Sequence, residues 1–368
     1  MLIIGPTPPP FHGVAVATQN LLSAQDNGRI GLIHLDIADR RGITYVDHPD
    51  LHDVYAFCKQ WSRLAWTLIR RRPQVVYLSI SQTTIGFLRD SLFVSLARAF
   101  RRKIVIHLHG GNFRTWYDGR SLLMKGLVRG VLSCATRFIV LADIFRDSLG
   151  PMVAPEKVVV VPNGIGWPLT TAQFRTRPRS QKCHVLFLST LSREKGALLL
   201  IEAVAQILAQ RHDVELTLAG PWLRETDRTA ALQLIEKYAL REEVLLPGEV
   251  EGGAKLGLYE SADIFVFPGI QQEGQPLVVL EAMASSLPVI FSNRGCLRET
   301  VVSGESGLQF NVSDAADLAK QLSWLVERPE EIERMGANAR RRYEELYSEG
   351  RFISNMTQVF LDALGATS

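Results

Sequence analysis

The chain has 368 residues, of which 46% are hydrophobic and 21% charged, and its 41 Lys and Arg against 38 Asp and Glu leave a net charge of +3. At roughly 100–200 residues per domain this length predicts two domains, and the composition excludes collagen-like, disulfide-scaffold and disordered proteins. The 4 cysteines stand far apart without CxxC pairs, which indicates neither a disulfide framework nor a zinc knuckle and favours a reducing, cytoplasmic setting.

Short apolar runs alternate with helical patterns through the first half of the chain. The predicted strands cover 2–5, 75–79, 103–109, 137–141 and 158–161, and the predicted helices cover 14–24, 88–100 and 122–134. Such alternation is typical of a parallel α/β sheet with helices on both faces. We therefore expect a first Rossmann-like domain over 1–168.

The same alternation restarts after a polar segment, 169–182, which is predicted to be a linker. The later predicted strands are 184–188, 214–219, 244–246, 264–266 and 288–291, with helices at 196–210, 229–238, 254–261 and 276–285. A second Rossmann-like domain is expected over 183–350, followed by a C-terminal helix within 351–368. Two doubly wound domains of this kind face a central cleft, and ligands bind outside the carboxyl ends of their strands.

The charge is distributed unevenly. Residues 1–168 hold 20 Lys and Arg against 11 Asp and Glu, whereas the remainder holds 21 against 27. In the basic half, 59–72 mixes Trp61 and Trp66 with aliphatic residues and arginines at helical spacing, and a second basic patch lies at 98–103. This composition is typical of a helix at an anionic lipid interface rather than of a nucleic-acid site. A helix packed on the core with a solvated basic face fits the same pattern equally well.

The most informative segment, 268–284, reads as a strand end, a glycine-containing loop and a helix opening at Pro276. Backbone N–H groups at a helix start favour an anion such as a diphosphate. Glu273 lies in the loop, where a carboxylate can accept hydrogen bonds from sugar hydroxyls. Glu281 lies among apolar residues and needs a partner, such as a ribose or a structural cation.

This segment, continued to 307, resembles the Glu-x7-Glu signature of the family 4 retaining glycosyltransferases, which have the GT-B fold. The resemblance implies that Glu273 contacts the hydroxyls of the donor sugar and that Glu281 contacts the ribose of the nucleotide. It also implies that a stretch of backbone surrounds the sugar and the diphosphate, formed by Gly274, Gln275, Pro276, Leu277 and Val278.

A second segment, 188–196, resembles the strand-to-helix loop in which an Arg and a Lys of this family neutralise the diphosphate leaving group. Lys195 fits the position of the family Lys, whereas Thr190 occupies that of the Arg. Arg193, three residues further on, is the candidate that supplies the second charge. A transferase that works without metal needs cations fixed where charge develops.

The first half carries weaker matches to the same family. The loop 8–13 resembles its glycine loop, with Gly13 as a donor contact, and His109 matches the histidine near the donor sugar. Together with His107, His109 would also suit a metal, but the sequence offers no third ligand nearby, so a sugar contact is favoured. The final helix resembles the one that crosses back to the first domain.

The resemblance implies a metal-independent retaining glycosyltransferase without a cofactor, which moves a hexose from a UDP- or GDP-sugar to an acceptor hydroxyl. His109, Lys195 and Glu273 are its predicted catalytic residues. The basic half adds the hypothesis of a lipid-linked saccharide acceptor at the cytoplasmic membrane face, in polysaccharide biosynthesis, with peripheral contact to anionic lipid. The alternatives are an enzyme with a soluble acceptor and a catalytically silent nucleotide-sugar-binding subunit, which Thr190 would favour.

Overall fold

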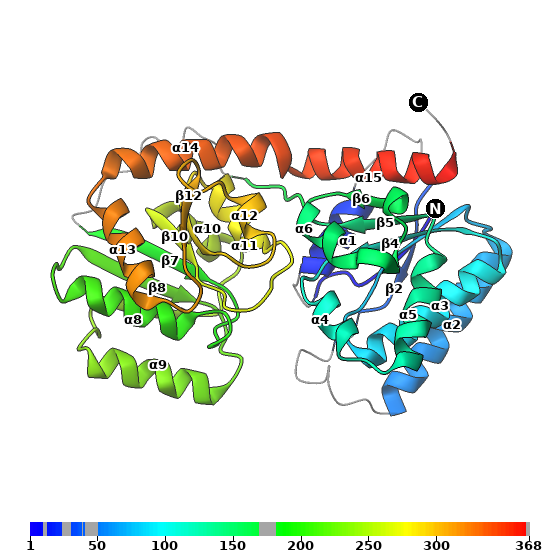
Figure 1. Cartoon of the computed structure of the whole chain (residues 1–368), viewed down its shortest axis with the longest axis horizontal. Helices are drawn as coiled ribbons and strands as arrows, with labels where there is room; N and C mark the ends of the chain where they lie inside the picture. The colour runs from blue at the N-terminus through cyan, green and yellow to red at the C-terminus, as the bar shows by residue number, and fades with distance from the viewer. Residues whose placement is uncertain (10–12, 24–30, 39, 41–50, 169–181, 366–368) are drawn as a thin grey trace. The chain divides into compact units, whose positions relative to one another are not determined.

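The computed structural model of the chain describes residues 1–9, 13–23, 31–38, 40, 51–168 and 182–365. It divides into two compact units, Met1–Ile165 with Glu349–Ser368 (unit 1) and Gly166–Ser348 (unit 2), which Figure 1 colours from blue to red along the chain. Apart from Lys182, the predicted linker lies outside the described residues.

Unit 1 is built on a parallel sheet with the strand order β2-β1-β3-β4-β5-β6. Its strands are β1 (Leu2–Gly5), β2 (Ile33–Asp36), β3 (Val75–Ser79), β4 (Lys103–Leu108), β5 (Arg137–Val140) and β6 (Val158–Val160). Its helices are α1 (Gly13–Ser23), α2 (Leu51–Arg70), α3 (Thr84–Ala99), α4 (Phe113–Asp118), α5 (Leu122–Ser133), α6 (Asp143–Leu149) and α15 (Glu349–Leu364).

The order in which the strands are connected determines which face of this sheet each helix covers. The step from β1 to β2 runs one way along the sheet and all later steps run the other way. Because βαβ crossovers are right-handed, α1 covers one face, whereas α2, α3 and α5 cover the opposite one. The terminal helix α15 packs beside α1, and its Phe352, Met356 and Phe360 join a core with Tyr77 and Val105 of the strands. The expected return of the last helix to the first unit is confirmed.

Unit 2 has the strand order β12-β11-β10-β7-β8-β9, again with all neighbours parallel. Its strands are β7 (Cys183–Leu188), β8 (Val214–Ala219), β9 (Val244–Gly248), β10 (Ile264–Phe267), β11 (Val289–Ser292) and β12 (Gly307–Phe310). Its helices are α8 (Ala197–Leu208), α9 (Glu225–Lys237), α10 (Gly252–Ser261), α11 (Leu277–Ala284), α12 (Leu297–Thr300), α13 (Ala315–Val326) and α14 (Pro329–Leu346). Renumbered from its first strand, this is the 3-2-1-4-5-6 order of a doubly wound nucleotide-binding sheet.

Both sheets confirm the predicted α/β class. Strands buried on both faces, such as β4 and β10, read in the sequence as continuous apolar runs because helices cover each side. Among the helices that the structure describes, none combines the length and the apolar character needed to cross a membrane.

Candidate functional site

The carboxyl edge of the unit 2 sheet brings two loops together. One loop follows β7 and leads into α8, and the other follows β10 and leads into α11. The strands β7 and β10 are neighbours, and the strand order reverses between them. Ligands of open α/β sheets bind at such a switch point. Lys195 belongs to the first loop and Glu273 to the second, so the fold places both predicted residues at this point.

Lys195 and Glu273 form a direct ion pair. The ammonium Nζ of Lys195 lies 2.6 Å from Oε1 of Glu273, and the two side chains are 25% and 14% exposed. The same ammonium lies 6.0 Å from the centre of the Phe267 ring, at the end of β10. Each charge therefore neutralises the other in a largely desolvated place, and an anion that enters would compete with Glu273 for the ammonium.

A glycine lets the two loops approach this closely. Gly196 has a φ of +84°, and a Cβ at this position would lie 2.3 Å from the carbonyl oxygen of Pro268. The Ile270 N–H also donates to the carbonyl oxygen of Glu194 over 2.9 Å, which joins the loops by their backbones. Any side chain at 196 would push the β10 loop, and Glu273 with it, away from Lys195.

The turn after β11 holds the Glu273 loop from its other side, by residues that the sequence analysis did not single out. The Gly295 N–H donates to Oε1 of Gln272 over 2.8 Å, and the Cys296 thiol donates to the carbonyl oxygen of Gly274 over 2.9 Å. Burial raises the pKa of Cys296 to about 12, which keeps the thiol protonated as a donor. The sequence offered one sign of this contact, the glycine of the Gly295–Cys296 pair shortly after strand β11. A glycine near a strand often marks a place where two backbones approach closely.

Helix α11 begins directly after this loop, with Pro276 as its N-cap and no acidic residue in its first turn. Leu277 and Val278 therefore stand where helical N–H groups lack intrahelical partners and attract anions. Gln275 is buried, and its Nε2 donates to the Thr300 hydroxyl over 3.2 Å. Its amide supports the loop in this way.

Glu281 lies further along α11 and has partners on α10. Its Oε1 accepts from Nζ of Lys255 at 2.6 Å, and its Oε2 accepts from the Tyr259 hydroxyl at 2.8 Å. Burial and the charge of Glu281 hold the pKa of Tyr259 well above its usual range, so the hydroxyl stays a donor. The structural-cation alternative for Glu281 thus accounts for its burial without a ribose, although a carboxylate can accept further hydrogen bonds.

The side chain of Arg193 is exposed, and within the described residues its guanidinium makes no ion pair. Its backbone N–H donates to Oδ2 of Asp227 over 3.3 Å. A different arginine, Arg224, contacts this loop and donates to Oε1 of Glu194 over 2.6 Å, which lowers the pKa of that carboxyl. The sequence analysis missed Arg224 because it lies in the connection after β8, without a recognisable motif.

The predicted residues of the first half belong to unit 1. Gly13 begins α1, and a Cβ placed on it would meet no atom within 4 Å. His109 follows β4, and its ring centre lies 3.8 Å from that of His107. The hydroxyl of the buried Tyr77 lies 2.9 Å from Nδ1 of His107 and 3.5 Å from Nε2 of His109. Burial and the neighbouring His109 hold the pKa of His107 well below its usual range, so His107 stays neutral.

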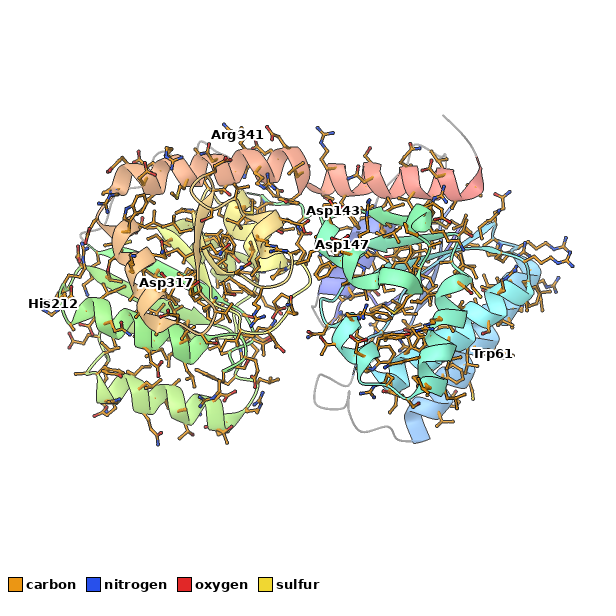
Figure 2. The ribbon with its side chains drawn as sticks, in the orientation of Figure 1. Trp61, Asp143, Asp147, His212, Asp317 and Arg341 are labelled. Carbon is orange, nitrogen blue, oxygen red and sulfur yellow. The ribbon has the colours of Figure 1, made fainter. Side chains whose placement is uncertain are left out.

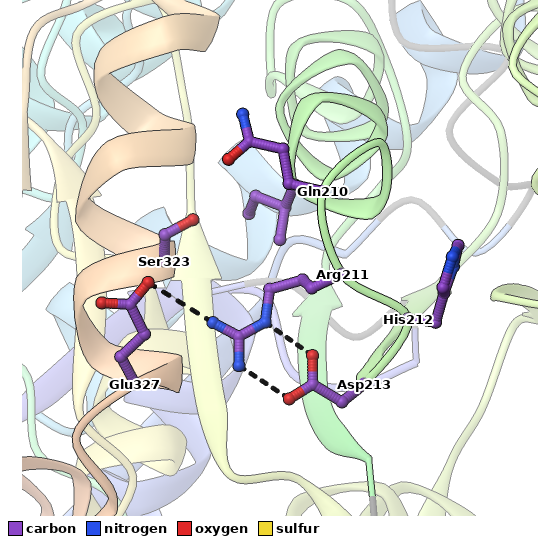
Figure 3. A pocket seen from close by; sticks show the side chains of 7 residues that line it. Gln210, Arg211, His212, Asp213, Ser323 and Glu327 are labelled. Carbon is purple, nitrogen blue, oxygen red and sulfur yellow. Dashed lines mark hydrogen bonds and ion pairs between the residues drawn. The ribbon is translucent and has the colours of Figure 1, made fainter.

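Two further features of the described residues concern metal binding and a pocket in unit 2. Among the described residues, no group of three or more His, Cys, Asp and Glu side chains is placed to hold a metal ion. A pocket of about 380 Å³ in unit 2 is lined by Arg211, Asp213, Ser323 and Glu327, among others (Figure 3). Its arginine is neutralised by ion pairs to both acidic residues, and none of the predicted site residues lines it.

The chain resembles proteins of known class. Residues 170–342 match the family model of glycosyl transferases group 1. The MMP alpha-(1->4)-mannosyltransferase of Mycolicibacterium hassiacum is 30% identical over 74% of this chain and 62% of its own length. The phosphatidyl-myo-inositol mannosyltransferase of Mycobacterium leprae is 32% identical over 50% of each chain. The chain thus spans about half to two thirds of the length of these curated relatives.

A solved structure supports the fold over the whole chain. The crystal structure of Anabaena HepE in complex with UDP-glucose superposes with a TM-score of 0.75 at 17% identity, covering 98% of this chain and 99% of that one. The fold expected from the sequence, GT-B with two Rossmann-like domains, is confirmed. Over residues 170–342, the chain is similar to the glycosyl transferases group 1.

Proposed function

We propose that the chain is a retaining glycosyltransferase, which moves a hexose from a UDP- or GDP-sugar to an acceptor hydroxyl without a metal ion. The observation that carries this proposal is the Lys195–Glu273 contact at the switch point of unit 2, beside the start of α11. A cation and a helix N-terminus at one place suit a diphosphate, and a neighbouring carboxylate suits sugar hydroxyls.

In the proposed reaction the anomeric carbon leaves the diphosphate oxygen and bonds to the acceptor oxygen on the same face of the sugar. The acceptor proton passes to the departing phosphate, so the products are a glycoside of retained configuration and a nucleoside diphosphate. Lys195 stabilises the charge that develops on the leaving group, and the N–H groups of Leu277 and Val278 add to this effect. Once the ammonium turns to the phosphate, Glu273 is released to accept from the sugar. We assign His109 to the donor sugar and Glu281 to the ribose side of the site.

The proposed acceptor is a lipid-linked saccharide at the cytoplasmic membrane face, as in polysaccharide assembly. The similarity to the phosphatidyl-myo-inositol mannosyltransferase of M. leprae, whose name includes a phospholipid, supports this choice. The tryptophans and arginines of α2 support it independently, because this composition suits a membrane interface.

The test compares wild type with Lys195→Ala, using Lys237→Ala, an exposed lysine at the end of α9, as the matched control. With UDP- and GDP-sugars, each with and without EDTA, we expect nucleoside diphosphate release by the wild type and the control. Lys195→Ala should lose about 10²–10³-fold in rate. The anomeric configuration of the product, read by NMR, tests retention.

A silent binding subunit is the second candidate, favoured by Thr190 at the position of the family Arg and by the outward side chain of Arg193. Such a subunit would bind one of the donors yet release no nucleoside diphosphate with any of them. Binding without turnover in the wild type would therefore replace the proposed enzyme by this candidate.

A further inference from the structure

One layer of unit 1 leaves an apolar surface exposed to solvent. Helices α2, α3 and α5 lie next to one another on the sheet face opposite α1 and α15. Phe57 of α2 stacks on Phe93 of α3 with ring centres 5.8 Å apart. The side chains that point away from the sheet therefore form one continuous surface over three helices.

Exposed large hydrophobic side chains gather on this layer. Of the 16 that are exposed among the described residues, 11 belong to these three helices, and we call this set the α2–α3–α5 face: Val54, Tyr55, Trp61, Trp66, Ile69, Ile85, Leu88, Leu92, Leu122, Leu123 and Leu127. Leu122 and Leu123, at the start of α5, are each 87% exposed. Most of the exposed large hydrophobic side chains of the described residues thus belong to one layer of helices, which marks an interaction site rather than scattered surface residues.

Helix α2 shows why this surface does not serve the core. Leu64 and Leu68 are fully buried and account for its inward face. Val54, Cys58, Trp61 and Ile69 recur at intervals of three, four or eight residues and form a second stripe, which is exposed; Figure 2 labels Trp61 on α2. A helix packed on the core with a solvated basic face explains the buried leucines, but it leaves two exposed tryptophans unexplained.

The segment that carries this face is predominantly basic, although Asp53 of α2 lies just before it. Residues 54–142 contain 15 Lys and Arg but 2 Asp and Glu, and both acids are paired: Asp90 with Arg89 at 2.8 Å and Asp118 with Arg114 at 2.7 Å. On α2, the basic residues Lys59, Arg63 and Arg70 are spaced to lie on one side of the exposed stripe. An apolar stripe with tryptophans and a basic edge matches the depth profile of an anionic bilayer, with acyl chains below and phosphates above.

We infer that the α2–α3–α5 face docks on an anionic lipid bilayer, with Leu122 and Leu123 entering the acyl region and Trp61 and Trp66 lying at the headgroup level. A nucleic acid would also be attracted by the positive charge of this segment. However, the bases of a single strand stack on aromatic side chains, so a nucleic acid would leave the exposed leucines and isoleucines of the face without a contact. This inference rests on the proposed function for its purpose, which is to bring a membrane-bound acceptor to the enzyme.

The test is co-sedimentation of the full chain with vesicles of phosphatidylcholine alone and of phosphatidylcholine with about one third phosphatidylglycerol. We expect strong binding to the anionic vesicles, weak binding to the neutral ones, and release by high salt. The double variant Leu122→Ser/Leu123→Ser should lose about tenfold or more in partition, and Arg63→Gln/Arg70→Gln should lose a similar factor on anionic vesicles alone.

The matched control is Leu232→Ser/Leu245→Ser, which removes two exposed leucines of unit 2 and should bind like the wild type. Equal melting temperatures of the variants show that binding, not folding, has changed. Equal binding to both vesicle types, equal loss in the control, or a chain that self-associates through this face without binding vesicles would each overturn the inference. Donor turnover without vesicles is measured in parallel, so that failure of docking is distinguished from failure of the proposed enzyme.

Discussion

The ion pair between Lys195 and Glu273 suggests how the candidate site stays poised before a donor arrives. The carboxylate occupies the ammonium that the diphosphate needs, at a Nζ–Oε1 distance of 2.6 Å. Two opposite charges held together cost little, whereas either one left alone in a largely desolvated place costs more. The two residues should therefore respond differently to removal, although they touch.

Substitution separates their roles in binding. Lys195→Ala should weaken the binding of UDP or GDP, because the diphosphate loses its cation. Glu273→Gln should leave this affinity unchanged or tighten it, because the ammonium loses its competitor, while transfer from the intact donor falls. Isothermal titration with UDP and GDP, combined with turnover measurements, checks the split. Equal weakening by both variants would contradict the competition between Glu273 and the diphosphate.

The loop contact at Gly196 gives a prediction about backbone shape. Gly196→Ala should destabilise the protein by at least about 1–2 kcal/mol, the cost of a left-handed conformation for a non-glycine residue, and should weaken donor binding. Gly257→Ala is the control, because this glycine lies within α10 and a Cβ there meets no atom within 4 Å. The control should keep or slightly raise the melting temperature. Unchanged stability and donor binding in Gly196→Ala would show that the close contact between the Lys195 loop and the Glu273 loop is not needed for either.

His107 predicts a pH dependence of stability. Its folded pKa lies well below 6.5, so below that pH the unfolded state binds a proton that the folded state does not. The contribution of this group to stability is complete above pH 6.5 and falls by about 1.4 kcal/mol per pH unit as pH drops below it, down to the folded pKa. Melting temperatures measured from pH 8 to pH 5 should decline less steeply in His107→Gln. As a control, His212→Gln, at an exposed position, should show the same decline of melting temperature with pH as the wild type. The same decline in the wild type and both variants would contradict this role of His107.

At the scale of elements, α15 supports the strand ends of unit 1. Phe360 packs edge-on against Tyr77, with ring centres 5.8 Å apart, and the Tyr77 hydroxyl contacts both histidines. Phe360→Ala should cost about 3–5 kcal/mol of unit 1 stability. Hydrogen exchange should show faster opening of β3 and β4, with β7 and β10 unchanged. Leu346→Ala, at an exposed position of α14, is the control. Uniform loss of protection in both units would show that α15 does not act on unit 1 alone.

The elements show what an apolar pattern can and cannot predict. The buried strands β3, β4 and β10 read as continuous apolar runs and were predicted within about one residue. The strands β2 and β12 were missed, because they close the edges of their sheets and mix polar with apolar residues. The polar helix α14 was missed for a related reason, since it buries few side chains.

The residues of the candidate site also divide into those that the sequence predicted and those that it did not. Lys195 and Glu273 stand 78 positions apart, and the resemblance to a family, not local spacing, predicted that they belong to one site. Two residues support the Glu273 loop by hydrogen bonds: the Gly295 N–H donates to the Gln272 side chain, and the Cys296 thiol donates to the carbonyl oxygen of Gly274. Such contacts depend on how β11 sits beside β10, which no local pattern in the sequence records.

For the whole molecule, the two halves of the chain differ in charge as their proposed tasks require. The first half is basic overall and carries the α2–α3–α5 face, which we propose meets an anionic bilayer. The second half is acidic overall, yet it presents Lys195 and the start of α11 at the switch point of its sheet. Charge complementarity is therefore local to each proposed partner, the lipid in one unit and the nucleotide sugar in the other.

The most direct test of the central claim is a thermal-shift comparison of wild type and Lys195→Ala with UDP- and GDP-sugars in the presence of EDTA. A donor at 100 times its Kd should stabilise the wild type by about 2.7 kcal/mol, because it binds the folded state alone. The account predicts a rise in melting temperature with one nucleotide class, unaffected by EDTA and strongly reduced in Lys195→Ala. A rise that EDTA abolishes, or one that is equal in the variant, would contradict a metal-free donor site at Lys195.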